Sequence, residues 1–240
     1  MEMLVKSLGG STAYGLNTPE SDLDYRGVFV NTEPAKILGL SKFDHVQKQE
    51  TDDIVYYEVR KFFELLRQGN TGALEILYSS VLIETTEAFT EIQVNKKHFV
   101  DTDRMFSCLR GYMQSERRLA NGERTGQLGG KRKVALDRFG FSPKNFVQLF
   151  RLARCGMSLF STGIFPVNLT EYDLEFRDEL LDIKVHPEKY TKEQLNERTD
   201  KADSDLKIAY DNRRVNLAFD ESLANETLRK IYLPYLLDGH

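Results

Sequence analysis

The sequence predicts an α+β protein, in which a small sheet with helices is followed by a mainly helical C-terminal region. Short runs rich in β-branched and aromatic residues, which are typical of strands, occur at 3–8, 22–30 and 54–57. Apolar residues at helical spacing dominate from residue 103 onward. We therefore expect two domains that meet in the stretch 97–103.

The first region is expected to alternate strands and helices. A strand at 3–8 ends in a turn at Gly9–Ser11, and a second strand follows at 22–30. The strand at 54–57 leads directly into a segment, 59–66, whose apolar residues recur at helical spacing. In this order, the turn Gly9–Ser11 lies between the first two strands.

The second region carries clear helix-start signals. Ser142 and Pro143 predict a helix start, because serine caps helices and proline suits their first turn. Gly163 predicts the end of that helix, since glycine is common just after a helix. Thr191 and Gln194 form a capping-box pattern at the start of another helix.

Composition narrows the classes of function. The chain lacks an apolar run of about 18 residues and a recognisable signal peptide, so we expect a cytoplasmic protein with no membrane partner. Cys108 and Cys155 show no pairing pattern and are expected to be reduced thiols. The four histidines are scattered, which gives no zinc or histidine-based catalytic motif.

Charge is distributed unevenly along the chain. The segment 104–154 holds twelve Lys and Arg against three acids, a net charge of +9. Since the whole chain carries −4, the remainder carries −13. The basic segment, which includes an expected flexible loop at 124–133, predicts an anionic partner such as a triphosphate or nucleic acid. The alternative is a solvated helix face whose cations pair with acids elsewhere in the chain.

The stretch 9–30 carries the clearest chemical pattern. The turn Gly9–Ser11 offers backbone N–H groups and a hydroxyl to phosphate, and its glycines permit close approach. Asp22 and Asp24 follow, one residue apart at the start of a strand, where alternate side chains point to the same side. Two carboxylates on one face suit hard divalent cations. The pattern predicts a site for a metal-bound nucleoside triphosphate.

Leu8-Gly9-Gly10-Ser11 followed by Asp22-Leu23-Asp24-Tyr25 resembles the signature of the DNA polymerase beta-like nucleotidyltransferase superfamily. The longer match from Gly10 to Val28, and blocks at 53–75 and 140–152, resemble the RlaP family of predicted nucleotidyltransferases, which is named for an RNA repair pathway. The resemblance spans most of residues 4–184. It implies a polymerase beta-like catalytic core with a small mixed sheet in 1–100, and a helical C-terminal domain in 101–240.

The resemblance also implies a site of three carboxylates that holds two Mg²⁺ or Mn²⁺ ions. Asp22, Asp24 and Asp53 are the expected catalytic and metal-binding residues, because the superfamily's third acid leads into a neighbouring apolar strand. Arg26 is a candidate salt-bridge partner that orients these acids. The other candidates for the third carboxylate are Glu58, as the alternative to Asp53, and Glu50 and Asp52.

A second set of residues is expected to contact the nucleotide. Lys144 and Arg151 lie seven residues apart, hence on one helix face, and a cationic stripe of this kind would hold the triphosphate. The alternative for this pair is a solvent-facing stripe, and for Tyr14 a packing role. The expected nucleotide-binding residues are Gly10, Ser11, Tyr14, Lys61, Lys144 and Arg151.

The function that the resemblance implies is transfer of a nucleoside monophosphate from a nucleoside triphosphate to an acceptor hydroxyl, with release of pyrophosphate. The family name and the basic segment favour RNA, such as a tRNA end, as the acceptor. Two alternatives remain open. One is nucleotidylation of a protein or small molecule, and the other is a non-catalytic module that binds nucleotides or RNA.

Overall fold

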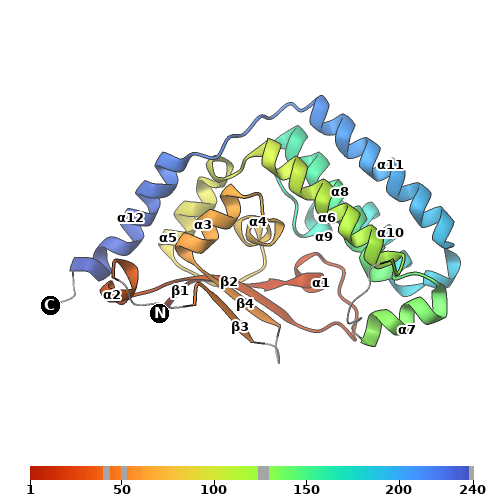
Figure 1. Cartoon of the computed structure of the whole chain (residues 1–240), viewed down its shortest axis with the longest axis horizontal. Coiled ribbons are helices and arrows are strands. Elements are labelled where there is room, and N and C mark those ends of the chain that lie inside the picture. Colours follow the sequence, from red (N-terminus) through yellow and green to blue (C-terminus); the bar gives the residue numbers. More distant parts are fainter. Residues whose placement is uncertain (40–43, 50–52, 124–129, 238–240) are drawn as a thin grey trace. The chain divides into compact units, whose positions relative to one another are not determined.

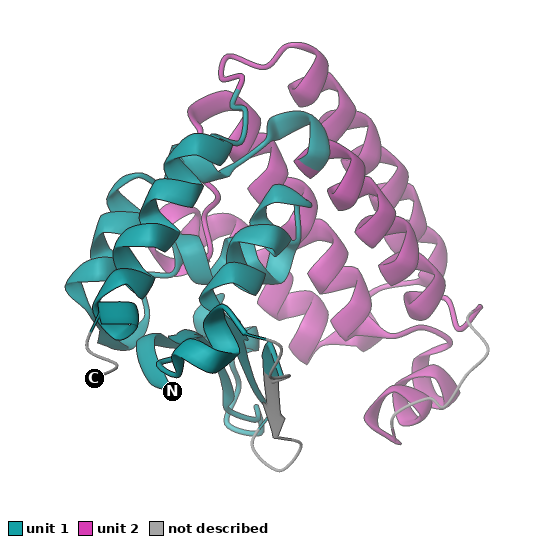
Figure 2. Cartoon of the chain, turned by 60° about the vertical axis from the view of Figure 1, so that its left-hand side comes forward, with its two compact units in different colours: residues 1–104, 217–240 teal, residues 105–216 magenta. Residues whose placement is uncertain are grey.

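A computed structural model describes residues 1–39, 44–49, 53–123 and 130–237. The chain divides into two units, coloured separately in Figure 2. Unit 1 consists of Met1–Arg104 and Leu217–His240, and unit 2 consists of Met105–Asn216. This division differs from the one expected at residue 100, because the C-terminal helix α12 (Glu221–Leu237) belongs to unit 1.

Unit 1 is built on a five-stranded mixed sheet with the strand order β3-β4-β2-β1-β5 (Figure 1). The strands are β1 (Glu2–Gly9), β2 (Asp24–Val30), β3 (Val46–Gln49), β4 (Ile54–Glu58) and β5 (Leu82–Thr85). β2 and β4 are parallel, and the other neighbouring pairs are antiparallel. The mixed α+β class is thus as predicted, whereas β3 and β5 were not anticipated from the sequence.

Helices of unit 1 cover the sheet because their apolar residues share one face. In α3, Val59, Phe62, Phe63 and Leu66 are all buried, which matches the predicted helical spacing. Figure 1 shows α3, α4 and α5 on the same side of the sheet. The helices of unit 1 are α1 (Gly10–Ala13), α2 (Pro34–Ile37), α3 (Val59–Arg67), α4 (Thr71–Tyr78), α5 (Glu87–Val94), the 3-10 helix η1 (Lys96–Phe99) and α12.

Unit 2 is helical, as predicted. Its elements are α6 (Thr102–Ala120), which begins in unit 1, α7 (Gly130–Phe139), α8 (Pro143–Thr162), α9 (Leu169–Tyr172), α10 (Leu174–Val185), the 3-10 helix η2 (Pro187–Lys189) and α11 (Lys192–Asp211). Ser142 precedes α8, Pro143 is its first residue, and Gly163 ends it at φ 76°, so the predicted bounds are confirmed. The Ser142 side chain makes no capping hydrogen bond to the backbone and instead donates to Asn145 Oδ1 at 2.7 Å. The capping box of Thr191 and Gln194 is also present at the start of α11.

Two expectations about secondary structure need correction. β2 begins at Asp24 rather than at Asp22, so Asp22 precedes the strand. Residues 131–133, expected in a basic loop, lie in the first turn of α7, while 124–129 lie outside the described residues. Within the described part of the chain, no helix is long and apolar enough to cross a membrane.

Candidate active site

Asp24 lies directly against the backbone of the predicted phosphate turn. It is the first residue of β2 and pairs with Gly9, the last residue of β1. Gly10 follows at φ 56°, in the left-handed region that favours glycine. A Cβ atom on Gly10 would lie only 1.6 Å from Asp24 Oδ2. The turn therefore needs glycine here so that the carboxylate of Asp24 can lie against its main chain.

Gly9 has a related role. A Cβ atom on Gly9 would lie 2.7 Å from Arg26 Cγ and 3.4 Å from Asp24 Cβ. Asp24 and Arg26 are separated by one residue in β2, so both side chains point to the same face of the sheet. The sequence interpretation assigned these glycines to close approach by phosphate. The structure adds that they make room for two side chains of β2.

Asp22 stands apart from this contact. It precedes β2 and is exposed, so the alternation of side chains along a strand does not set its direction. The side chain of Asp24, in contrast, is only 16% exposed. The two predicted metal ligands thus have different environments, one at the surface and one against the turn.

Asp53 and Asp24 both lie close to the guanidinium of Arg26. Asp53 lies immediately before β4 at φ 44°, and no other described non-glycine residue has a positive φ. Its carbonyl oxygen accepts hydrogen bonds from the Tyr25 amide at 3.2 Å and from Arg26 Nη1 at 2.7 Å. Arg26 Nη2 lies 3.7 Å from Asp24 Oδ1 and 3.6 Å from Asp53 Oδ1. The structure therefore brings both predicted carboxylates to one guanidinium group.

Glu58, the alternative third carboxylate, lies elsewhere. It pairs with Phe29, whose side chain points to the sheet face opposite that of Asp24. Glu58 is buried, caps α3 by accepting from the Arg60 amide at 2.9 Å, and accepts from the Tyr232 hydroxyl of α12 at 2.5 Å. Burial and the hydrogen bond to Glu58 raise the pKa of Tyr232 well above its ordinary value. These contacts give Glu58 a structural role in attaching α12.

Ser11 and Tyr14 lie in and after α1, next to Gly10. The carbonyl oxygen of Ser11 accepts from the Leu16 amide at 2.8 Å. The Tyr14 hydroxyl donates to Glu75 Oε2 of α4 at 2.7 Å. Tyr14 thus links the C-terminal end of α1 to α4. The two residues are 61 positions apart, so no local sequence signal reveals this contact.

The predicted cationic residues are divided between the two units, with Lys61 in unit 1 and Lys144 and Arg151 in unit 2. Lys61 lies in the first turn of α3, which begins at the end of β4 opposite to Asp53, and its Nζ is 3.3 Å from Glu64 Oε2. Lys144 is exposed in α8 of unit 2. Arg151 is 0% exposed, and its Nε donates to Gln148 Oε1 at 3.1 Å. The burial of Arg151 contradicts the alternative of a solvent-facing stripe of Lys144 and Arg151, whereas contact of these residues with a nucleotide stays a prediction.

The donor chemistry at Asp22 and Asp24 suits a hard divalent cation, because both offer carboxylate oxygens. Among the described residues, however, no group of three or more His, Cys, Asp or Glu side chains could hold a metal ion. The group that lies near both Asp24 and Asp53 is the guanidinium of Arg26. The other two candidates, Glu50 and Asp52, lie outside the described residues.

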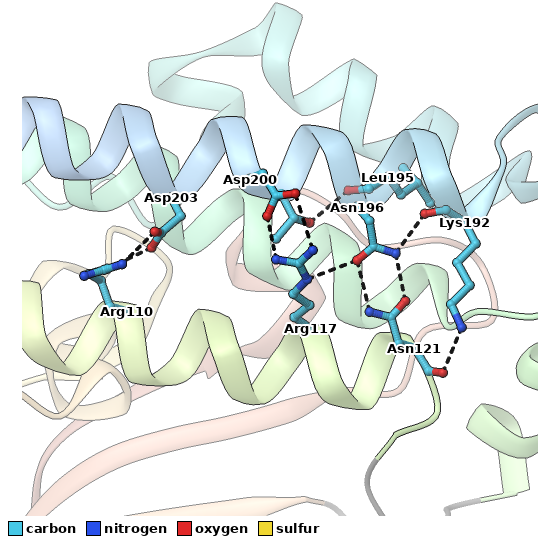
Figure 3. A network of polar contacts seen from close by, with 9 residues as sticks. Arg110, Arg117, Asn121, Lys192, Leu195, Asn196, Asp200 and Asp203 are labelled. Carbon is cyan, nitrogen blue, oxygen red and sulfur yellow. Dashed lines mark hydrogen bonds and ion pairs between the residues drawn. The ribbon is translucent and has the colours of Figure 1, made fainter.

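Arg110, Arg117 and Arg154 of the basic segment 104–154 pair with acids inside unit 2, and Figure 3 shows the first two. Arg110 Nε and Nη2 donate to both carboxylate oxygens of Asp203 at 2.8 and 2.7 Å. Arg117 Nη1 donates to Asp200 Oδ1 at 2.6 Å. Arg154 Nε similarly donates to Asp173, at 2.7 Å. For these cations the alternative of pairing with acids elsewhere in the chain is the one observed.

The cations of α7 behave differently. Arg132, Lys133 and Arg138 form no ion pair within the described residues, although Arg138 lies 4.9 Å from the ring centroid of Phe139. α7 has no fully buried residue. α7 therefore presents three of the cations of the basic segment that form no ion pair within the described residues, and Arg104, Arg118 and Lys144 are exposed elsewhere in the segment.

Comparison with known proteins gives two matches. Residues 1–222 match the family described as "RlaP: RNA repair pathway DNA polymerase beta family". A protein of Enterobacteria phage T4, described as "Uncharacterized 38.9 kDa protein in nrdC-mobD intergenic region", is 31% identical over 130 residues, which cover 48% of this chain and 38% of the relative. The match thus spans less than half the length of that relative. Because the family match covers nearly all of the sequence, the chain belongs to the RlaP family, a DNA polymerase beta family of an RNA repair pathway.

Proposed function

We propose that the protein is a metal-dependent nucleotidyltransferase of the polymerase beta type, with its catalytic core in unit 1. It would transfer a nucleoside monophosphate from a nucleoside triphosphate to an acceptor hydroxyl and release pyrophosphate. The observation that carries this proposal is the contact between Asp24 and Gly10, where a Cβ atom would meet the carboxylate at 1.6 Å. A candidate metal ligand and candidate phosphate donors thus share one place. Membership of the RlaP family supports a nucleotidyltransferase.

Each residue of the site has a role in this proposal. Asp22 and Asp24 would hold Mg²⁺ or Mn²⁺ through their carboxylate oxygens. When bound, two such ions neutralise the triphosphate and activate the acceptor hydroxyl. Ser11 and the backbone of the turn would bind phosphate oxygens. Asp53 remains the proposed third carboxylate, held next to Asp24 by Arg26.

We further propose RNA as the acceptor, in a cytoplasmic protein. The family description refers to an RNA repair pathway. In addition, Arg132, Lys133 and Arg138 of α7 form no ion pair within the described residues and so present positive charge to solvent. Phosphates of a nucleic acid are the partner that such a helix would attract most strongly.

Labelled nucleotides test the proposal. The full chain is incubated with each labelled nucleoside triphosphate, with Mg²⁺ or Mn²⁺, and with total RNA. The proposal expects label on RNA, and expects the double variant Asp22→Ala with Asp24→Ala to transfer none. Label on protein instead would support nucleotidylation of a protein. Transfer that persists in the double variant would overturn the site, and no transfer with any nucleotide would favour a binding module.

A further inference from the structure

The Arg26 side chain binds two main-chain carbonyl groups, one at Tyr25 in β2 and one at Asp53 just before β4. Its Nη1 donates to the Tyr25 carbonyl at 2.9 Å and to the Asp53 carbonyl at 2.7 Å. The Asp53 carbonyl also accepts from the Tyr25 amide at 3.2 Å. Asp53 is thus fastened to the start of β2 by two hydrogen bonds, and a third bond holds the Arg26 side chain to Tyr25.

This anchoring stabilises an unfavourable backbone conformation. Asp53 adopts φ 44°, a left-handed conformation that residues other than glycine adopt uncommonly. Hydrogen bonds that involve a charged donor are stronger than neutral ones and help to hold such a conformation. The carbonyl of Asp53 receives one of them from Arg26. The conformation of Asp53 therefore depends on Arg26.

The other nitrogen of the same guanidinium lies near the two carboxylates. Arg26 Nη2 is 3.7 Å from Asp24 Oδ1 and 3.6 Å from Asp53 Oδ1. The Arg26 side chain is 25% exposed, and its Cγ lies over Gly9, so the charge is partly shielded and fixed in place. Because Nη1 is bound to the main chain, the charge cannot move away from the carboxylates without breaking those bonds.

We propose that Arg26 is a positioning residue that fixes the main chain at Asp53 to β2 and sets a permanent positive charge near both Asp24 and Asp53. In the absence of a metal ion, this charge keeps two aspartates together that would otherwise repel each other. It also opposes the binding of a divalent cation at Asp24. The importance of that second effect for catalysis rests on the proposed function, whereas the fixing of the main chain at Asp53 does not.

Two variants separate charge from geometry. Arg26→Lys keeps the charge but loses the fork that binds both carbonyl groups, and Arg26→Gln loses both. Lys230→Gln is a matched control, because Lys230 also lies near two carboxylates, Glu91 at 3.4 Å and Glu226 at 3.3 Å, on the outside of α12. Asp24→Asn identifies the Mn²⁺ ions that bind at the candidate site rather than to other surface acids.

The first measurement is the Mn²⁺ affinity of the full chain, which is determined by electron paramagnetic resonance in the absence of nucleotide. Removing one charge near a divalent ion should tighten its binding in Arg26→Gln by about tenfold. Arg26→Lys and Lys230→Gln should stay within about twofold of the unmodified chain, because the first keeps the charge and the second is remote. An equal or weaker Mn²⁺ affinity in Arg26→Gln overturns the proposal.

The second measurement is hydrogen exchange of the Tyr25 amide without metal. Exchange should be faster by about tenfold or more in both Arg26 variants, since each loses the bonds that hold the Asp53 carbonyl. Unchanged exchange overturns the proposal. If the unmodified chain shows no Mn²⁺ binding that depends on Asp24, the proposed function fails, and the exchange result alone decides whether Arg26 fixes the main chain at Asp53.

Discussion

Arginine meets aspartate in both units, but the geometry differs. In unit 2, Arg110 directs its short bonds, 2.7 and 2.8 Å, to the carboxylate of Asp203 (Figure 3). In unit 1, the short bonds of Arg26, 2.7 and 2.9 Å, go to backbone carbonyls, and its distances to the carboxylates are 3.6 and 3.7 Å. Arg110 thus forms a side-chain ion pair between two helices. Arg26 makes its short hydrogen bonds to the main chain, and its guanidinium lies near the two carboxylates at longer distances.

This difference separates a structural ion pair from a candidate functional one. Arg110 and Asp203 form a bidentate ion pair, in which two guanidinium nitrogens donate to the two carboxylate oxygens. This strong pair links α6 to α11. Arg26 instead commits its nearest donor to holding the main chain at Asp53. The carboxylates beside it are therefore positioned without being matched to the guanidinium. We expect substitutions around Asp24 to reduce nucleotide transfer more than stability. Substitutions of the pair Arg110 and Asp203 should reduce stability more than transfer.

Among the substitutions that keep every carboxylate of the candidate site, the largest effect is expected from Gly10→Ala. The added Cβ atom would overlap Asp24 Oδ2 and would also disfavour the φ of 56°. Displacing a metal ligand by about 1 Å is enough to reduce nucleotide transfer by about a hundredfold. The matched control is Gly111→Ala on α6, where a Cβ atom would meet no described atom within 4 Å. Transfer by Gly10→Ala at the unmodified rate would show that Asp24 need not lie against the turn.

Lys133 and Arg138 of α7, which form no ion pair within the described residues, contrast with the paired arginines of α6. Replacing Lys133 and Arg138 by Gln should weaken RNA binding by about tenfold at 0.15 M salt, and should reduce the salt slope by about 1.4. The control removes two lysines of α11, Lys201 and Lys207, from the same unit. Binding is measured by fluorescence anisotropy across a salt series. Equal losses in both variants would mean that α7 has no special role.

Tyr232→Phe tests the assignment of Glu58 to structure. The change removes the hydroxyl that donates to the buried carboxylate at 2.5 Å, and should lower the free energy of unfolding by about 1–3 kcal/mol. Nucleotide transfer by Glu58→Gln should persist, because Glu58 lies on the sheet face opposite Asp24. Loss of transfer in Glu58→Gln, with folding intact, would return it to the candidate site.

The same pair has a defined pH dependence. The folded-state pKa of Tyr232 is raised above its ordinary value of 10.0, first by burial and then by the hydrogen bond to Glu58. The neutral hydroxyl therefore stabilises the folded chain fully below about pH 10, and this contribution is lost as pH rises further. Urea unfolding should show a steeper decline above pH 10 in the unmodified chain than in Tyr232→Phe. Parallel declines would contradict this account.

The smallest effect is expected from Asp203→Asn. Arg110 and Asp203 are 37% and 35% exposed, so solvent screens their attraction, and the loss should be about 0.5–1 kcal/mol of unfolding free energy. Nucleotide transfer should be unaffected. The readouts are urea unfolding and the rate of transfer. A large loss of transfer with stability retained would contradict the structural role of this pair.

Local signals in the sequence predicted the local structure well. Ser142, Pro143 and Gly163 mark the ends of α8, and Thr191 with Gln194 opens α11, because each signal acts within one helical turn. The predicted start of β2 was two residues early, since nothing in the pattern distinguishes a strand from the extended chain before it.

Long-range features were out of reach from the sequence. Arg151 has the spacing of an exposed stripe with Lys144, yet it is buried, because helical spacing gives a face but not what covers it. The contacts of Tyr14 with Glu75 and of Tyr232 with Glu58 join residues 61 and 174 positions apart. For the candidate site, the pattern of glycines and aspartates was visible, whereas the contact of Asp24 with Gly10 required the sheet register.

The most direct test of the account compares Asp24→Asn with Asp203→Asn in a single-turnover assay of labelled nucleotide transfer. Both variants remove one carboxylate charge beside an arginine. We expect Asp24→Asn to transfer at least about a thousandfold more slowly, because a metal ligand is lost, and Asp203→Asn to transfer at the unmodified rate. Transfer by Asp24→Asn at the unmodified rate would contradict the assignment of the active site.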